Sequence, residues 1–191
     1  MFGRARPLRI ESERLLLRLP RIEDHVAWAK LRIDGENYLA PWEPIRSRDH
    51  LTRGAFRTRC TWAARSARDD KALPLFIFDK SDETLMGAIT LDNIQRGPAQ
   101  FATIGYWMGQ PFIRNGYMQE AVRATVAHAF GRLDLSRVQA GCLPENAASR
   151  RVLEKSGFKY EGVAQNYLRI AGEWRTHVLY AALREDRRGK G

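Results

Sequence analysis

The sequence predicts a mixed α/β domain in which helices come first, an antiparallel meander follows, and strands then alternate with helices. Three observations support this fold class. The 191 residues are enough for one domain with a substantial core. Apolar residues recur at helical spacing, change to strand-like runs between residues 73 and 108, and then alternate between the two patterns. No internal repeat or low-complexity linker divides the chain, so residues 1–191 are treated as one domain.

The first third of the chain is predicted to contain one strand and two helices. Residues 8–19 fit a strand, because alternate leucines would share one face. Apolar spacing predicts helices over residues 23–33 and 49–67. Arginines crowd the stretch from Arg46 to Arg68, and both a solvated helical face and a nucleic-acid-binding patch fit them.

The rest of the chain is predicted to supply six strands and two helices. A three-stranded meander occupies residues 73–78, 85–94 and 100–108, with turn residues between the strands. After it we expect a helix over residues 119–133, a strand over 137–143, a helix from Asn146 to Ser156 that stops at Gly157, and a hairpin of residues 158–170 and 173–183. The expected sheet therefore has about seven strands, mostly antiparallel, flanked by helices.

Composition excludes several functional classes. Hydrophobic content of 44% and charged content of 28% are those of a soluble globular protein. No apolar stretch approaches the roughly 20 residues of a membrane helix, and the basic residues 1–7 are not followed by the apolar segment of a secretory signal. Cys60 and Cys142 are far apart, and the histidines have no metal-ligand spacing. We therefore expect a cytoplasmic protein without a metal or a membrane partner.

The net charge of +10 points to an anionic partner: a phosphorylated cofactor, RNA, an acidic surface, or several of these. The basic tail, residues 184–191, is expected to be frayed.

A candidate phosphate site lies at residues 113–121, Ile-Arg-Asn-Gly-Tyr-Met-Gln-Glu-Ala. This short loop has a basic residue and a glycine and opens directly onto a helix, whose first N–H groups and dipole favour an anion. The loop is too short for a Walker P-loop, and its single glycine excludes a G-x-G-x-x-G motif. An ordinary loop-to-helix junction has the same pattern, so both interpretations stay open here.

Two segments together resemble a known family. Residues 105–121 and residues 144–158 (Pro-Glu-Asn-Ala-Ala-Ser-Arg-Arg-Val-Leu-Glu-Lys-Ser-Gly-Phe) are similar to the acetyl-CoA-binding and following motifs of the GNAT superfamily of N-acetyltransferases. Residues 41–44 and 166–179 resemble its RimJ/RimL branch, which acetylates the N-terminal amine of ribosomal proteins. The resemblance spans nearly the whole chain. It implies the GNAT fold, acetyl-CoA as co-substrate, and direct transfer of acetyl from the thioester to an amine.

The sequence departs from the family pattern at four positions. Ile113 occupies a position that is usually Gln or Arg, and Met118 occupies the final small position of the loop, where RimJ-type sequences tolerate methionine. Leu153 replaces the tyrosine that many family members use as general acid. Thr103 stands where RimL-like enzymes often carry a glutamate, and it cannot act as a base.

The resemblance implies a cofactor site built mainly from backbone groups. The loop would cradle the pyrophosphate, the strand around Trp107 and Met108 would face the pantetheine arm, and Asn146, a predicted helix N-cap, would also reach that arm. Gly116 is the one loop residue whose side chain matters, because close approach or a positive φ requires glycine. The implied cofactor-binding residues are Trp107, Met108, Arg114, Asn115, Gly116, Tyr117, Met118, Gln119 and Asn146.

The resemblance also implies candidate catalytic residues. With the tyrosine position occupied by Leu153, it places Ser149 at the CoA sulfur as general acid or thiolate stabiliser, although a serine that merely begins a helix fits equally well. Glu43 is the remaining candidate for the base, acting through water, and a loop carboxylate that pairs with arginine is the alternative. His177 titrates in the right range, but a lone histidine in a terminal strand is more often structural.

Because Glu43 would be a weak base, an α-amine is the favoured acceptor. An α-amine has a pKa of about 7.7–8.0, about one unit above pH 7, whereas the pKa of lysine is about 10.4, more than three units above it. Deprotonating lysine at pH 7 therefore costs about 4.6 kcal/mol. Trp42, Glu43, Tyr106 and Tyr167 are predicted to line a groove for a peptide N-terminus, and core packing is the alternative for the three aromatic residues. We therefore expect acetylation of a ribosomal protein N-terminus by a monomer or homodimer whose basic surface lies near ribosomal RNA. The alternatives are acetylation of a small amine, or a non-catalytic ribosome- or RNA-binding module.

Overall fold

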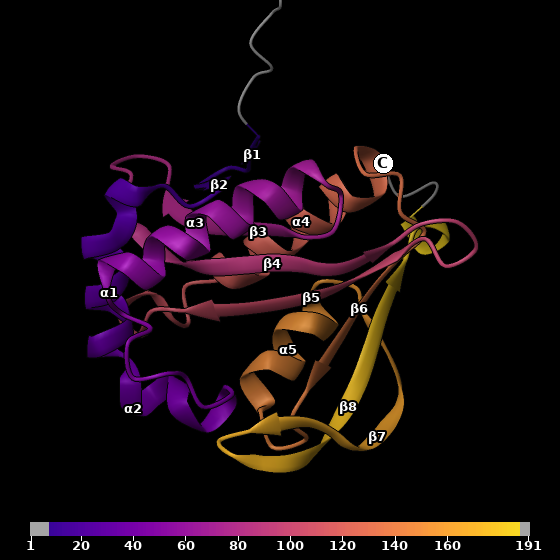
Figure 1. Cartoon of the computed structure of the whole chain (residues 1–191). Helices are drawn as coiled ribbons and strands as arrows, with labels where there is room; N and C mark the ends of the chain where they lie inside the picture. Colours follow the sequence, from indigo (N-terminus) through magenta and orange to yellow (C-terminus); the bar gives the residue numbers. More distant parts are fainter. Residues whose placement is uncertain (1–7, 188–191) are drawn as a thin grey trace, which may run out of the picture.

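The computed structural model describes residues 8–187, which form an eight-stranded sheet with helices on both faces (Figure 1). The strand order is β1-β2-β3-β4-β5-β6-β8-β7, and every neighbouring pair is antiparallel except β5 and β6. The mixed α/β fold and the mostly antiparallel sheet are thus confirmed. The count of about seven strands was one too low.

The additional strand comes from residues 8–19, which form a hairpin instead of the single predicted strand. β1 (Arg9–Glu11) pairs with β2 (Leu15–Arg18) across a turn that has no glycine, proline or asparagine to mark it in the sequence. The Ser12 N–H donates to the Leu15 carbonyl at 3.0 Å, and the Leu15 N–H donates to Ser12 Oγ at 3.2 Å. A serine side chain therefore closes this turn.

The N-terminal segment forms five helical elements: η1 (Ile22–Asp24), α1 (His25–Asp34), α2 (Glu36–Leu39), η2 (Ala40–Trp42) and α3 (Arg53–Arg68). Of these, η1, α1 and α3 pack against one face of the sheet. The helices predicted over residues 23–33 and 49–67 correspond to α1 and α3, and Thr52 caps α3 by accepting from the Ala55 N–H. The short α2 and η2 were not predicted, because one turn shows no apolar period.

The remaining elements follow the predicted order. They are β3 (Leu73–Asp79), β4 (Leu85–Gln95), β5 (Phe101–Met108), η3 (Gln110–Phe112), α4 (Tyr117–Gly131), β6 (Arg137–Cys142), α5 (Ala147–Lys155), β7 (Lys159–Ile170), β8 (Glu173–Leu183) and η4 (Glu185–Arg187). β3, β4 and β5 form the expected meander.

Strand alternation divides the core into two layers. Leu75 and Ile77 of β3 pack in the cluster that contains α4, whereas Phe76 and Phe78 pack with Trp28 of α1 and with α3. Because successive side chains of a strand point to opposite faces, α4 and α5 cover one face and α1 and α3 cover the other. Each residue of β5 and β6 can therefore be assigned to one side.

β5 and β6 pair over only three residues. The last pair is Thr103 with Gln139, where Gln139 Nε2 donates to Thr103 Oγ1 at 3.3 Å. Beyond it β5 continues beside β4 while β6 continues beside β8, and the two strands diverge (Figure 1). Within residues 8–187, the fork leaves the backbone edge of residues 104–108 without a strand partner on the β6 side.

The predicted frayed tail is ordered over its first residues. The Arg184 guanidinium contacts Asp134 and the Phe130 carbonyl, and the Arg184 N–H donates to the Ser136 carbonyl at 3.0 Å. Residues 1–7, where we expect no secretory signal, and residues 188–191 lie outside the described part of the chain.

Candidate active site

The predicted phosphate loop leads into α4 with two left-handed residues. Arg114 has a φ of 64° and Gly116, the N-cap of α4, has a φ of 79°. A helix leaves its first four N–H groups without intrahelical acceptors, and Gly116 is exposed where they begin. Of the two reasons given for a glycine at position 116, close approach of the backbone to phosphate or a positive φ, the structure shows the positive φ. An anion at this point would meet peptide donors at the positive end of the helix dipole.

The side chains of the loop divide between solvent and core. Arg114 and Asn115 are exposed, Tyr117 and Gln119 are half-buried, and Met118 is buried in the core cluster below α4. Met118 can therefore offer only its backbone to a ligand. Its place in the core explains why a large apolar residue is accommodated at this loop position.

The start of α5 is built as the sequence predicted. Asn146 caps the helix, and its Oδ1 accepts the Ser149 N–H at 3.0 Å. Leu153, which stands at the position of the family tyrosine, is buried in the core. The N-cap role of Asn146 is confirmed, while its contact with the pantetheine arm stays a prediction.

Ser149 is held in a small polar cluster. Its Oγ lies 3.0 Å from the Tyr106 hydroxyl, which also lies 3.3 Å from the Ser149 carbonyl. The Cys142 thiol, at the end of β6, contacts the same serine. Burial raises the pKa of Tyr106 well above its ordinary value, although the hydrogen bond to Ser149 opposes this effect. Burial likewise raises the pKa of the Cys142 thiol.

This cluster contains two residues whose contact with Ser149 the sequence did not reveal. Tyr106 was assigned to the acceptor groove, but its side chain belongs to the α4 and α5 layer. Cys142 was treated only as an isolated cysteine. No local signal links Tyr106 to Ser149, because 43 residues separate them and only the fork brings them together.

Glu43 lies on the opposite face and is paired with two arginines. Its carboxylate accepts from both terminal nitrogens of Arg32, with Nη1 at 2.8 Å, and Arg46 Nη2 lies 3.3 Å away. Burial raises the pKa of Glu43, but the hydrogen bond and charge of Arg32, aided by Arg46, lower it overall. This arrangement favours the arginine-pairing interpretation of Glu43 over the base.

The Arg32–Glu43 pair covers Trp107. The Arg32 guanidinium lies 4.9 Å from the centre of the Trp107 ring, and Trp107 packs at the edge of the α1 and α3 cluster. Met108 is buried in the other cluster. The Met108 side chain thus fills the core and that of Trp107 packs half-buried under Arg32, so we expect a cofactor to meet mainly the backbone of this strand.

The turn of the β7–β8 hairpin meets the loop that carries Glu43. The Ala171 N–H donates to the Glu43 carbonyl at 2.9 Å. Tyr167 packs edge-on against His177, with ring centres 5.6 Å apart, and both lie over Gly141 of β6. His177 is buried, and its Nδ1 lies 2.9 Å from the Arg175 carbonyl, which holds the ring in the hairpin.

The candidate residues therefore form two groups on opposite sides of the fork. The cofactor side contains the loop of residues 114–119 together with Tyr106, Asn146 and Ser149. The other side contains Trp42, Glu43, Trp107 and Tyr167. Trp42 and Tyr167 remain exposed there.

A family model for the acetyltransferase (GNAT) domain matches residues 14–159. The chain belongs to this family. The probable N-acetyltransferase YjcK of Bacillus subtilis is 37% identical over 82% of this chain and 86% of its own length. The [ribosomal protein uS5]-alanine N-acetyltransferase of Escherichia coli is 30% identical over 94% and 92%. The structure of Mycobacterium smegmatis RimJ in complex with CoA-disulfide superposes with a TM-score of 0.89 at 31% identity, covering 95% of this chain and 90% of that one.

The protein is thus an acetyl-CoA-dependent N-acetyltransferase related to the RimJ and RimL enzymes. Among residues 8–187, no group of three or more histidine, cysteine, aspartate or glutamate side chains is placed to hold a metal ion. No helix in the same part of the chain is long and apolar enough to cross a membrane.

Proposed function

We propose that the protein transfers the acetyl group of acetyl-CoA to the N-terminal α-amine of a ribosomal protein. The observation that carries this proposal is the similarity to the uS5-alanine N-acetyltransferase across nearly the full length of both chains.

In the proposed complex, the diphosphate of acetyl-CoA lies on the N–H groups at the start of α4. The pantetheine arm then runs along the free edge of β5, past Asn146, and places the thioester at the fork. This path brings the sulfur to Ser149, which lies with Tyr106 on the cofactor side. The backbone donors of Tyr106 to Met108 would polarise the thioester carbonyl, as the donors of an oxyanion hole do.

Ser149 then acts on the leaving group by donating a hydrogen bond to the sulfur. A thiol has an ordinary pKa of about 8.5 and tyrosine one of about 10, and burial raises the pKa of Tyr106 further. Proton transfer from Tyr106 to the thiolate is therefore uphill, and Tyr106 stays neutral. Its hydroxyl orients Ser149 Oγ at 3.0 Å, and the pair stabilises the thiolate until water protonates it.

The acceptor reaches the carbonyl from the opposite side of the fork. Exposed Trp42 and Tyr167 would contact the first residues of a peptide there. Because Arg32 and Arg46 neutralise Glu43, we assign Glu43 a structural role: its ion pairs hold the loop that carries it and Trp42 against α1. The amine loses its proton to water, which suits an α-amine with a pKa near neutrality.

The basic surface would bring the enzyme to its acceptor. Arginines of α3 project outward, and Arg53, Arg57, Arg65 and Arg68 are exposed. Such a surface suits an approach to ribosomal RNA in the cytoplasm. Arg59 does not take part, because it stacks on Trp28 at 5.2 Å.

Purified protein and acetyl-CoA, incubated with a panel of acceptors, test the proposal. The panel contains three kinds of acceptor. The first is N-terminal peptides of the organism's ribosomal proteins with a free amine. The second is the same peptides with a formylated N-terminus, so that an internal lysine is their one free amine, and the third is polyamines. We expect CoA release and an acetyl group on the first residue of at least one free-amine peptide, and none with its formylated partner. Turnover on polyamines alone would reject the proposed acceptor. CoA binding without release would favour a non-catalytic module.

A further inference from the structure

We propose that Arg14 and Glu120 are positioning residues that hold the phosphate loop in the orientation in which it binds coenzyme A. The proposal rests on the proposed cofactor site and deepens it. It gives a function to the turn between β1 and β2, which lies about a hundred residues before the loop in the sequence.

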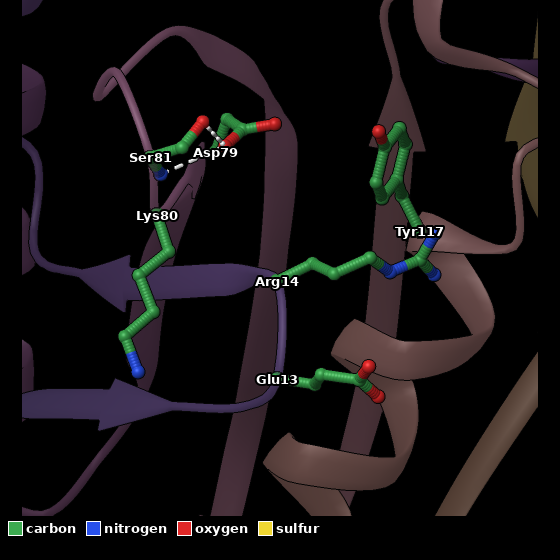
Figure 2. A pocket seen from close by; sticks show the side chains of 6 residues that line it. All are labelled: Glu13, Arg14, Asp79, Lys80, Ser81 and Tyr117. Atoms are coloured by element: carbon green, nitrogen blue, oxygen red, sulfur yellow. Dashed lines mark hydrogen bonds between the residues drawn. The ribbon is translucent and has the colours of Figure 1, made fainter.

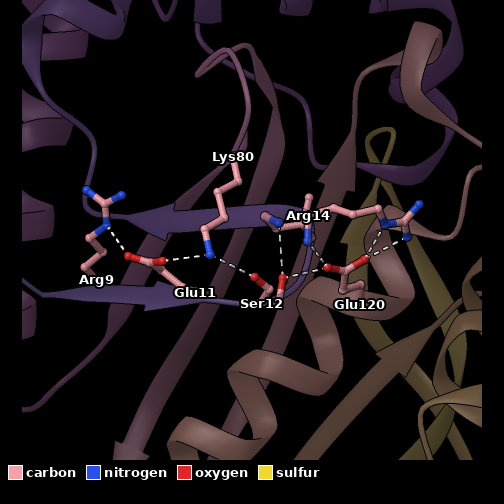
Figure 3. A network of polar contacts seen from close by, with 7 residues as sticks. Arg9, Glu11, Ser12, Arg14, Lys80 and Glu120 are labelled. Atoms are coloured by element: carbon pink, nitrogen blue, oxygen red, sulfur yellow. Dashed lines mark hydrogen bonds and ion pairs between the residues drawn. The ribbon is translucent and has the colours of Figure 1, made fainter.

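Glu120 fastens this turn to the first turn of α4 (Figure 3). Its Oε1 accepts the Ser12 hydroxyl at 2.7 Å and the Arg14 N–H at 2.8 Å. Its Oε2 accepts Arg14 Nε at 2.7 Å. One carboxylate thus receives three hydrogen bonds from residues 12–14, which tie the β1–β2 turn directly to the start of α4.

Arg14 extends this connection to the phosphate loop itself. Its Nη1 donates to the Asn115 carbonyl at 3.1 Å, and its guanidinium lies 4.5 Å from the centre of the Tyr117 ring. In a trans peptide the C=O of one residue and the N–H of the next point in opposite directions. Holding the Asn115 carbonyl toward Arg14 therefore turns the Gly116 N–H to the other side of the loop, where the other free donors of α4 begin.

The Arg14–Glu120 ion pair also neutralises a negative charge beside the phosphate loop. Burial raises the pKa of Glu120, but the hydrogen bonds from Arg14 and Ser12 and the charge of Arg14 lower it overall. Glu120 is therefore ionised at neutral pH, one turn away from the proposed diphosphate. Arg14 Nη2 neutralises it at 2.7 Å. Without Arg14, an unpaired carboxylate would repel the cofactor.

Two other cations of the described residues, Lys80 and Arg123, line the cavities beside Arg14, and both have partners elsewhere: Arg123 Nη2 donates to the Lys155 carbonyl at 2.6 Å. Figure 2 shows Arg14 extending between Lys80 and Tyr117. These three residues line a surface cavity of about 380 Å³. Lys80 pairs instead with Glu11 at 2.9 Å. Truncating Arg14 would leave the Asn115 carbonyl facing open space, with little effect on the core.

Calorimetric titration with CoA, combined with steady-state kinetics, tests these roles. For Arg14→Ala we expect the Kd for CoA and the KM for acetyl-CoA to rise about tenfold, as for the loss of one charge-assisted hydrogen bond, with kcat changed less than about twofold. Arg96→Ala is the matched control. Arg96 also bridges a carboxylate, Asp70, and a carbonyl, that of Leu133, but it lies beyond the other end of α4.

Two further variants separate orientation from charge. Arg14→Lys restores the positive charge but cannot bridge Glu120 and Asn115 in the same way, so its Kd should lie between those of wild type and Arg14→Ala. In Arg14→Ala/Glu120→Gln the repulsion is removed, and part of the lost affinity should return. A purely structural role would instead lower the melting temperature of all these variants and of Arg96→Ala alike, and leave Kd unchanged.

The outcomes distinguish this proposal from the proposed cofactor site. If wild type binds CoA, and Arg14→Ala and Arg14→Lys both bind it with the wild-type Kd, the positioning roles are refuted and the site stands. If wild type does not bind CoA, or if Gly116→Val binds it normally, the site itself is wrong. Should Arg14→Ala not fold, Arg14→Lys carries the test, and an unchanged Kd for that variant overturns the proposal.

Discussion

Replacing Glu43 with glutamine separates a catalytic base from a structural ion pair. In the structure the Arg32 side chain is 8% exposed and that of Glu43 is 12% exposed, so the pair is largely withdrawn from water. Glutamine keeps one oxygen for Arg32 but removes the charge. Arg32 would then remain buried above Trp107, with the amide in place of the carboxylate and the positive charges of Arg46 and Arg59 nearby.

The expected loss of stability follows from this geometry. A charge-assisted hydrogen bond replaced by a neutral one in a buried pair costs about 2 kcal/mol. For a domain of this size that lowers the melting temperature by about 4–8 °C. Because the pKa of Glu43 is lowered, the pair's contribution is present above the unfolded-state value of about 4.3 and is lost as the pH falls through the folded-state pKa. The difference between wild type and Glu43→Gln should therefore be full at pH 7 and shrink below about pH 4.

Thermal unfolding and steady-state rates of the same samples provide the assay. At 25 °C the variant should stay folded, and kcat should remain within about threefold of wild type. Loss of a general base would instead cost about 10²–10⁴-fold in kcat. Glu161→Gln is the control, because Glu161 pairs with both terminal nitrogens of Arg137 but is more exposed, and its loss should matter less. An unchanged melting temperature with a hundredfold loss of rate would refute our reading of Glu43.

Three further predictions concern the cofactor side. Ser149→Ala should lower kcat about tenfold, as expected for one lost hydrogen bond to the thiolate, and leave the calorimetric Kd for CoA unchanged; full activity would remove Ser149 from the mechanism. Asn146→Ala should destabilise the protein by about 1 kcal/mol through loss of the N-cap, which denaturant unfolding would measure. With an N-terminal peptide, kcat/KM should rise with pH to a plateau above about pH 8, as the amine deprotonates, without a decline from Tyr106, because burial raises its pKa. A falling alkaline limb that disappears in Tyr106→Phe would contradict this assignment.

Helices and strands whose apolar residues recur at a regular spacing were predictable from the sequence. The meander and the helices α4 and α5 follow directly from apolar spacing, and the N-cap at Asn146 and the positive φ at Gly116 depend on local residue types alone. The hairpin at residues 8–19 was missed, because its turn is closed by a serine and anchored by Glu120, more than a hundred residues away.

The same distinction applies to the site. The phosphate loop is a local motif and could be located by its residues. The contacts between Tyr106 and Ser149, and between Arg14 and Asn115, join positions separated by 43 and 101 residues. They arise from the divergence of β5 and β6 and from the packing of the β1–β2 turn on α4, which a single sequence does not specify. The pairing of Glu43 with arginine was foreseen as an alternative, but its partner Arg32 was not.

A crystal structure with bound CoA tests the central claim most directly. We expect the diphosphate oxygens about 2.7–3.2 Å from the N–H groups of residues 116–119, with the sulfur beside Ser149. A diphosphate bound elsewhere on the protein, or held only by side chains while these N–H groups face solvent, would contradict the account.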